Sequence, residues 1–357
     1  MKLIIRIVII MAMVFSLSGC FGGNGAVTPS GSDARPSASP DNIGGGPSAI
    51  VSITGPYTYE QMQKDSGALA SAYPGMVKLS SIGKSVEGRD LTLLKIGKGE
   101  KKVLFLGAHH AREYISSSYL MKMVDEYLRA YAGSGKYGNY NVKNLLDSLT
   151  IYVVPMVNPD GVNLVQHGVD SVKDPAKVKA MAQLGKDYSE WKANIHGVDL
   201  NRQYPCHWED KPSQTGGPAS EMYKGTAPTT EPEVQAVMKL CGEDRFELAA
   251  SFHSKGEIIY WADSGTVDAI PAAQSIAQSL ADVSGYELTP VSEDPASYGG
   301  GFENWFRQEY HLPGFCVELT PEGGGNGPFD DSRFDSAVWQ KAKYLGIELF
   351  SQALDSK

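Results

Sequence analysis

Several short segments combine residue types that can bind a metal ion or move a proton. The segment 107–113 offers two imidazoles and a carboxylate within a few residues. His110 and Glu113 are three residues apart and His109 and Glu113 are four apart, so either pair can face one ion from a helical turn. The spacing leaves the choice of histidine open, and a single His-x-x-Glu pair is more often a salt-bridged surface turn.

Three further positions complete a set of catalytic residue types. His253 ends an apolar run, and two histidines with one glutamate leave the fourth position of a zinc ion for water. Glu318 lies inside another apolar run, where a carboxylate is costly unless it has a partner or a task such as general base beside a metal. Asn201 and Arg202 can hold a carboxylate through an amide and a bidentate guanidinium. Taken singly, these residues also fit a structural histidine, a buried salt bridge and an exposed turn arginine.

The elements that must position these residues follow from apolar periodicity. Continuous apolar runs predict buried strands, alternation predicts half-buried strands, and a period near 3.6 predicts helices. We expect strands at 77–82, 91–96, 103–107, 149–155, 248–252, 258–261 and 315–319, and helices at 59–72, 115–131, 270–284, 301–310 and 335–353. Alternating strands and helices indicate an α/β sheet with helices on both faces, whose sites form at the carboxyl ends of strands.

The N-terminal region has the features of an exported lipoprotein. Two basic residues begin a short apolar stretch that closes in Leu-Ser-Gly-Cys, which resembles the bacterial lipobox. We expect a signal peptide over 1–19, a lipidated Cys20, a flexible Gly/Ser/Pro-rich tether over 20–52 and one catalytic domain over 53–357. The alternative is an uncleaved anchor with an incidental cysteine. The first interpretation predicts a bacterial cell-surface protein that is held on the membrane by its lipid.

Charge and cysteine count set further limits. The chain of 357 residues has 32 basic and 41 acidic side chains, a net charge of −9, and no basic run, which argues against nucleic-acid binding. After processing, Cys206, Cys241 and Cys316 remain, and an odd number cannot all pair internally. A Cys206–Cys241 disulfide and three free thiols are equally compatible with the sequence. We expect a monomer.

In their order along the chain, the motifs resemble the M14 family of zinc carboxypeptidases. The resemblance spans nearly all of 57–350 and consists of His-x-x-Glu, Asn-Pro-Asp-Gly at 158–161, Gly-Val-Asp-x-Asn-Arg at 197–202, a strand-end His-Ser and a strand Glu. It implies a single α/β domain with a mixed, mainly parallel eight-stranded sheet flanked by helices. It also implies His110, Glu113 and His253 as ligands of one zinc ion per chain, and Glu318 as the base.

The resemblance implies substrate contacts as well. Asn201 and Arg202 correspond to the family's carboxylate anchor, and Arg112 of the first motif is expected to contact substrate too. Lys192 follows a tryptophan and occupies the place of a family arginine that stabilises the oxyanion of the tetrahedral intermediate. Lysine keeps the positive charge of that arginine but lacks its bidentate guanidinium. A solvated lysine beside a packed tryptophan is the alternative.

Two residues depart from the family pattern near the substrate side chain. Tyr298 lies two positions late for the family's mobile tyrosine. Glu303 lies between a glycine run and a tryptophan, and it is either an exposed acid or a wall of the specificity pocket. In the pocket it would suit a substrate side chain that carries an amine.

The segments Trp-Lys-Ala-Asn and His-Ser-Lys-Gly-Glu-x-x-Tyr-Trp resemble the bacterial branch of the family. That branch includes γ-D-glutamyl-L-diamino-acid peptidases, which cut muropeptides between D-glutamate and meso-diaminopimelate. We therefore expect a zinc peptidase acting near a free substrate carboxylate, with this cell-wall bond as the candidate substrate. The alternatives are a general metallocarboxypeptidase that releases C-terminal residues and a non-catalytic surface lipoprotein that binds peptides.

Overall fold

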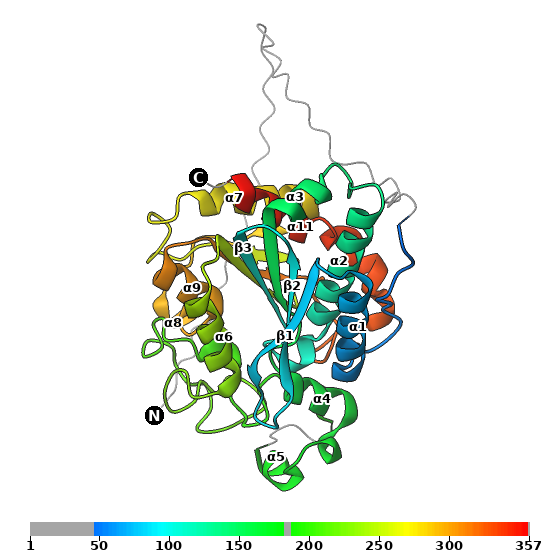
Figure 1. Ribbon diagram of the computed structural model, residues 1–357. Helices are drawn as coiled ribbons and strands as arrows, with labels where there is room; N and C mark the ends of the chain where they lie inside the picture. Colours follow the sequence, from blue (N-terminus) through cyan, green and yellow to red (C-terminus); the bar gives the residue numbers. More distant parts are fainter. Residues whose placement is uncertain (1–45, 182–186, 356–357) are drawn as a thin grey trace, which may run out of the picture. The chain divides into compact units, whose positions relative to one another are not determined.

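A computed structural model describes residues 46–181 and 187–355 of the chain. The predicted signal peptide, Cys20 and most of the predicted tether lie outside these residues. The described part forms an α/β domain around an eight-stranded sheet with the strand order β1-β2-β4-β3-β5-β8-β6-β7 (Figure 1). Among the described helices, none combines the length and the apolar character needed to span a membrane.

The sheet is mixed, as expected. Its centre, β4-β3-β5-β8, is parallel; β1, β2 and β4 pair antiparallel, as do β6 and β8, while the short β7 lies parallel to β6. The strands are β1 (Val77–Lys84), β2 (Asp90–Gly97), β3 (Lys101–Gly107), β4 (Leu149–Val154), β5 (Leu248–His253), β6 (Ile258–Tyr260), β7 (Glu287–Leu288) and β8 (Gly314–Glu318).

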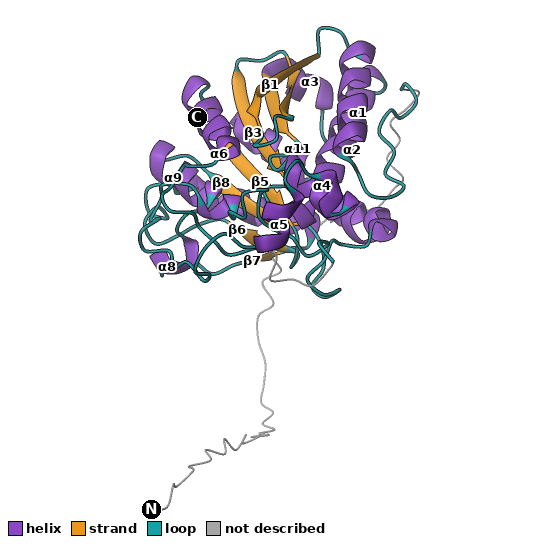
Figure 2. Ribbon diagram, turned by 90° about the horizontal axis from the view of Figure 1, so that it is seen from below, coloured by secondary structure: helices purple, strands orange, loops and turns teal. Residues whose placement is uncertain are grey.

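Helices cover both faces of the sheet (Figures 1 and 2). The α-helices are α1 (Tyr59–Ala72), α2 (Ile115–Ala132), α3 (Val142–Ser148), α4 (Pro159–His167), α5 (Pro175–Met181), α6 (Pro232–Glu243), α7 (Ala272–Ser284), α8 (Pro295–Tyr298), α9 (Phe302–Tyr310), α10 (Gln340–Ala342) and α11 (Leu345–Asp355).

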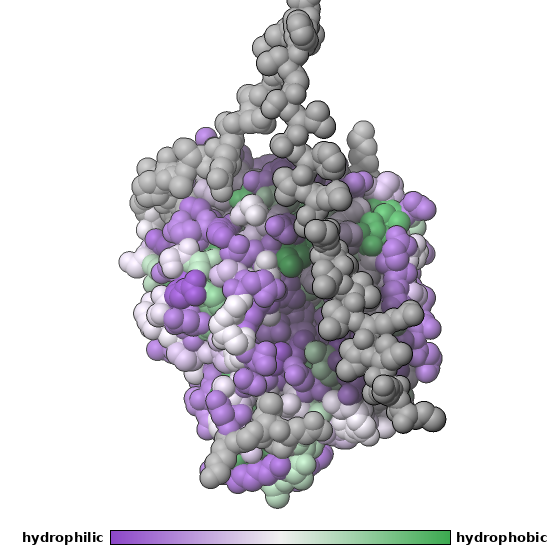
Figure 3. All heavy atoms as spheres, turned by 180° about the vertical axis from the view of Figure 1, so that it is seen from behind, coloured by the Kyte–Doolittle hydropathy of each residue, from purple (hydrophilic) through white to green (hydrophobic). Residues whose placement is uncertain are grey.

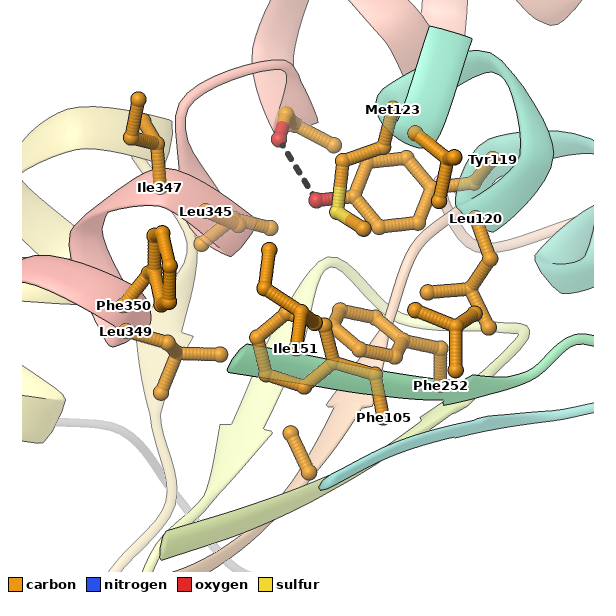
Figure 4. Packing of buried hydrophobic residues seen from close by; sticks show 14 of the residues in the cluster. Phe105, Tyr119, Leu120, Met123, Ile151, Phe252, Leu345, Ile347, Leu349 and Phe350 are labelled. Carbon is orange, nitrogen blue, oxygen red and sulfur yellow. Dashed lines mark hydrogen bonds between the residues drawn. The ribbon is translucent and has the colours of Figure 1, made fainter. Parts of the chain in front are cut away.

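Alternation along β3 divides the interior into two layers. Val103 and Phe105 belong to the larger cluster, with α1, α2, α3, α7 and α11, whereas Leu104 and Leu106 belong to the cluster with α6 and α9. Successive strand residues point to opposite faces, so a strand buried on both sides reads as one continuous apolar run. Figure 4 shows the larger layer, where Phe105, Tyr119 and Phe252 lie together.

The sequence predicted the central strands and the longer helices but missed six elements: α3, α4, α5, α6, α8 and β7. The two-residue β7 is too short to produce a periodic signal, and helices α4 and α6 were not anticipated although each begins with a proline at its first turn. The helix expected over 335–353 is not continuous: it begins as a π-helical segment, Phe334–Trp339, and continues as α10 and α11.

The folded part begins earlier than the predicted boundary at residue 53. The backbone N–H groups of Ile50 and Val51 donate to Asp125 Oδ2 in α2, at 3.0 and 3.2 Å, and Arg129 Nε donates to the Pro47 carbonyl at 2.8 Å. A buried carboxylate needs such donors, so residues 47–51 belong to the domain and not to a free tether.

The three cysteines of the described domain are buried and unpaired, so the Cys206–Cys241 disulfide is not formed. Burial raises the pKa of the Cys206 thiol to about 12, which keeps it protonated and unreactive near neutral pH.

The surface of the described domain is mainly polar, as the view from behind shows (Figure 3). Within that part of the chain the large hydrophobic residues left exposed are Leu79 and Tyr260, at 41% and 43%. Single exposed apolar residues are ordinary on a soluble surface.

Candidate active site

The predicted chemical residues meet where three neighbouring strands end. The metal-binding segment follows β3, His253 is the last residue of β5, and Glu318 is the last residue of β8. β5 lies between the other two strands, and its His253 is the direct partner of Glu318 across the parallel pair. Parallel strands bring their carboxyl ends to one edge, so the sheet itself gathers these side chains.

Three buried side chains form the group that the sequence predicted as metal ligands. His110 Nδ1, His253 Nδ1 and Glu113 Oε2 lie 3.0–3.1 Å from one another. A tetrahedral zinc ion with bonds of about 2.1 Å has ligand atoms roughly 3.4 Å apart. The triangle is therefore close to the size of one face of a zinc site.

The hydrogen bonds around His110 support the same conclusion. Its Nε2 lies 3.1 Å from Asp199 Oδ1, which assigns the proton to Nε2 and leaves a lone pair on Nδ1. His110 Nδ1 lies 3.1 Å from His253 Nδ1, and Glu113 Oε2 lies 3.0 Å from each of them, so two ring nitrogens and a carboxylate oxygen converge on one place. A bound cation would satisfy these converging atoms. Two imidazoles and one carboxylate are ligands that zinc commonly takes in proteins.

Asp199 is buried between His110 and Arg202. Its Oδ2 accepts a hydrogen bond from Arg202 Nε at 3.2 Å. Burial alone would raise the pKa of Asp199, but the charges of His110, Lys192 and Arg202 hold it well below its usual range. This carboxylate is therefore ionised near neutral pH, and it orients both the imidazole and the guanidinium.

His109 is not a ligand, which settles the ambiguity of the first motif. Its Nε2 lies 2.9 Å from the Tyr204 hydroxyl, and its ring stacks on His253 with 5.7 Å between centroids. Burial, followed by the neighbouring imidazoles, lowers the pKa of His109 well below its usual range. His109 therefore remains neutral and packs against the ligand ring.

Glu318 lines the cavity as a part-buried side chain. Its Oε2 is buried and has no hydrogen-bond partner within the described residues. Burial, reinforced by the charge of Glu113, raises the pKa of Glu318 well above its usual range in the metal-free chain. A divalent cation at the neighbouring ligands opposes that shift, and an acid poised in this way can exchange protons with water.

A cavity of about 660 Å³ opens over these strand ends. It is lined by the metal ligands His110 and His253, by Glu318, and by all but one of the predicted substrate-contacting residues: Lys192, Asn201, Arg202, Tyr298 and Glu303. Residues from distant parts of the sequence thus share one chamber.

The Asn-Arg pair has a free donor for a substrate. Arg202 Nη1 is buried without a partner among the described residues, while its Nε is held by Asp199. An unpaired buried donor is costly, so this nitrogen is suited to an acceptor such as a carboxylate. Asn201 lines the same wall, although its Oδ1 accepts the Phe302 N–H at 2.9 Å, so its amide nitrogen is the group that can reach a ligand.

Arg112 does not line this cavity. Its Nη1 donates to the Glu190 carbonyl at 2.8 Å and its Nη2 pairs with Glu221 at 3.1 Å. These contacts fix the turn that precedes Lys192, so the structure places Arg112 in a supporting position outside the main chamber.

Glu303 is buried, not exposed. Only 8% of it is accessible, it lines the cavity, and it forms no ion pair with any described residue. Its Oε2 accepts a long hydrogen bond of 3.4 Å from Ser251 Oγ. Tyr298 lies on the same wall, in α8, with its ring edge-on to His207 at 5.4 Å. Glu303 is therefore a buried carboxyl group on the cavity wall with no ion-pair partner among the described residues.

Comparison with known proteins agrees with this geometry. The sequence profile of the zinc carboxypeptidase family M14 matches residues 62–330. The chain belongs to this family. It is 36% identical over 299 residues to γ-D-glutamyl-L-diamino acid endopeptidase 1 of Lysinibacillus sphaericus, covering 82% of this chain and 71% of that protein. It is 27% identical over 287 residues to carboxypeptidase B of Astacus astacus, covering 75% and 87%.

Solved structures share the fold. The crystal structure of thrombin activatable fibrinolysis inhibitor matches with a TM-score of 0.65 at 23% identity, covering 84% of this chain and 75% of that one. Carboxypeptidase A of Helicoverpa armigera matches with a TM-score of 0.61 at 19% identity, covering 84% and 74%. The predicted fold class is thus confirmed, and this M14 chain is a zinc-dependent peptidase.

Asn158 and Asp160 stabilise the loops around the M14 site, and their roles were not assigned from the sequence. The Asn158 amide nitrogen donates to the carbonyls of His109 and Ala193, at 3.2 and 3.0 Å, and so ties the metal loop to the loop that carries Lys192. Asp160 accepts from Ser85 and from the Glu87 N–H, at 2.9 and 2.7 Å, which anchors the β1–β2 turn. The Asn-Pro-Asp-Gly motif was visible, but its tertiary partners were not.

Asn194 and Glu233 support the next turn. Asn194 Oδ1 accepts the backbone N–H groups of His196 and Val198, at 3.0 and 3.2 Å, and its amide nitrogen lies 3.3 Å from Glu233 Oε2. Burial raises the pKa of Glu233 to about 7. This network fixes the segment between Lys192 and Asp199.

Proposed function

We propose that this M14 peptidase hydrolyses the bond between γ-D-glutamate and a diamino acid in cell-wall peptides. The observation that carries the proposal is Glu303, a buried acid in the substrate chamber without a cationic partner among the described residues. A buried charge needs an opposite charge, and the free amine of a diamino acid supplies one. The similarity to an enzyme named for γ-D-glutamyl-L-diamino acid peptides supports the same choice.

The residues of the chain divide the reaction between them. His110, His253 and Glu113 would hold a zinc ion, which would supply a Lewis acid for the scissile carbonyl and for the attacking water. Glu318 takes the proton of the attacking water and returns it to the leaving amine. Lys192 lines the chamber with its positive charge toward the developing oxyanion, and acts as a point charge because it lacks the guanidinium fork.

The Asn-Arg pair orients the substrate. The free Nη1 of Arg202 receives the carboxylate of the residue that leaves, and Asn201 adds its amide nitrogen. Holding this carboxylate fixes the scissile bond relative to Glu318 and converts binding energy into orientation.

The test is mass spectrometry of muropeptides after incubation with the zinc-loaded protein. The expected products are free diamino acid, or a peptide beginning with it, and a fragment ending in γ-D-glutamate. Glu318→Gln is the matched control, because it removes the base and leaves the metal ligands in place. Unchanged muropeptides with the wild-type protein would refute the proposal.

A general carboxypeptidase is the second candidate, favoured by the free Nη1 of Arg202, which fits any C-terminal carboxylate. Acyl-dipeptides with ordinary C-terminal residues separate the two: efficient release of neutral residues supports this candidate. A protein that only binds peptides is the third, and a zinc-loaded chain without hydrolysis of either substrate class supports it.

We further propose that the protein acts outside the cell as a monomer, anchored by a lipid on Cys20 after removal of residues 1–19. The Leu-Ser-Gly-Cys sequence behind a short apolar stretch supports this proposal. Metabolic labelling with a fatty-acid analogue tests it, with Cys20→Ser as the control that abolishes labelling.

A further inference from the structure

One cation of the substrate chamber has no role in the mechanism above. Lys211 lies between β4 and β5 in the sequence, lines the same cavity as Arg202 and Glu303, and is part-buried. Its Nζ donates to the Ser297 carbonyl in α8. No pattern in the sequence distinguishes this lysine from the other surface lysines.

The other cations of the chamber are already assigned. Arg202 is held by Asp199, with one nitrogen free for the carboxylate of the leaving residue. Arg307 is neutralised by Asp263, at 2.9 Å, and also donates to the Gly314 carbonyl. Lys192 lines the cavity and is assigned above to the developing oxyanion. Lys211 alone among these cations combines a place on the substrate wall with only a neutral protein partner among the described residues.

Lys211 and Glu303 act on the same region of the chamber. Four charged side chains of the chamber influence the ionisation of Lys211 through their charges. They are Arg202, Asp199, Glu303 and Lys192. Burial, followed by the charge of Arg202, lowers the pKa of Lys211 to about 8. A partly desolvated ammonium gains more from a carboxylate than an exposed one does.

The charges match one kind of leaving residue. A C-terminal diaminopimelate that is still joined to γ-D-glutamate through one amine has two carboxylates and one free amine, because its side chain ends in both an amine and a carboxylate. Lysine has the amine but no second carboxylate. Besides Lys192, the chamber offers two cations with free donors, Arg202 and Lys211, and one acid that forms no ion pair with a described residue, Glu303.

We propose that Lys211 binds the second carboxylate of a leaving residue whose side chain also carries an amine, and thereby selects diaminopimelate over lysine. The inference rests on the proposed function, since it requires a γ-D-glutamyl diamino-acid substrate. Arg202 then holds the carboxylate next to the scissile bond, and Glu303 and Lys211 hold the two ends of the zwitterionic side chain.

A purely structural role for Lys211 makes a different prediction. If the lysine only pins α8 through Ser297, its removal shifts Tyr298 and weakens all substrates alike. Loss of a substrate ion pair instead affects only the substrate that has the second carboxylate.

The test compares kcat/KM of the zinc-loaded enzyme on three peptides: acyl-γ-D-Glu-meso-diaminopimelate, the same peptide with its distal carboxylate amidated, and acyl-γ-D-Glu-L-Lys. In Lys211→Met the preference for the first peptide over the other two is expected to fall by about tenfold or more, mainly through KM. Lys211→Arg is expected to restore most of the preference. Lys224→Met is the matched control, because Lys224 Nζ also donates to a backbone carbonyl, that of Trp208 at 2.8 Å, but does not line the chamber.

The outcomes separate the two proposals. A wild-type enzyme that cleaves none of the three peptides overturns the proposed function, and this inference with it. A wild-type enzyme that cleaves them, together with an unchanged preference or an equal loss on all three in Lys211→Met, overturns the role of Lys211 alone. Equal cleavage of the amidated and free peptides by the wild type does the same.

Discussion

Replacement of Asp199 by asparagine tests whether one carboxylate serves both the metal and the substrate. The side chain is 1% exposed, and its two oxygens contact His110 Nε2 at 3.1 Å and Arg202 Nε at 3.2 Å. Asparagine keeps the shape but removes the charge, and it can offer an oxygen to only one of the two donors. The other donor then faces an amide N–H.

Both functions are expected to weaken. Loss of the partner of a metal-ligating imidazole lowers metal affinity by about 10- to 100-fold, which corresponds to about 1.4–2.7 kcal/mol. KM for a substrate with a free carboxylate is expected to rise as well, because Arg202 loses the group that orients it. The zinc dissociation constant is measured by competition with a chromophoric chelator, and KM by peptide hydrolysis at saturating zinc.

A matched control separates local from general effects. Asp244 also forms salt bridges, with Lys102 and Lys95, but lies away from the metal, so Asp244→Asn is expected to bind zinc like the wild type. A zinc dissociation constant within twofold of the wild type in a folded Asp199→Asn protein would refute the reasoning.

Four other changes have expected outcomes. Glu318→Gln should keep one zinc per chain by elemental analysis but lose at least about 100-fold in kcat, because the proton acceptor is gone; wild-type turnover would remove the residue from its role. His253→Ala should fail to retain stoichiometric zinc, since one of three protein ligands is absent. Glu303→Gln should reduce the preference for substrates with an amine in the side chain over neutral ones, and an unchanged preference would contradict the assignment. The pKa of Glu233 is raised from 4.5 to about 7 in the folded protein, so its contribution to stability is present below about pH 4.5 and is lost as the pH rises through 7; the fall in Tm between pH 5 and pH 8, measured by calorimetry, should be smaller in Glu233→Gln, and an identical fall would be contrary evidence.

The metal ligands could be predicted because strand ends and short-range spacing are visible in a sequence. His110 and Glu113 lie in one turn, and His253 and Glu318 each end an apolar run that becomes a central strand. The choice between His109 and His110 required either the family resemblance or the position of Asp199, 89 residues away from His110.

The substrate chamber was harder to predict because its walls come from loops. The burial of Glu303 depends on how α9 packs against β5 and β8, and the position of Lys211 depends on a contact with α8. Such contacts are set by tertiary packing and leave no periodic signal in the chain. The same reason explains why Arg112 was expected in the chamber, while its guanidinium contacts Glu190 and Glu221.

The proposed catalytic groups lie at strand ends and the proposed recognition groups lie mainly in loops, and this separation has a consequence for engineering. The proposed metal ligands and Glu318 lie at the ends of β3, β5 and β8, whose positions are fixed by main-chain hydrogen bonds at the centre of the sheet. The proposed recognition groups belong to the segments 199–211 and 297–303, which are joined to each other by backbone hydrogen bonds of Gly300 with Tyr204 and Cys206 and by side-chain contacts. Exchange of these two segments together between relatives should therefore transfer substrate preference while the hydrolytic machinery stays in place.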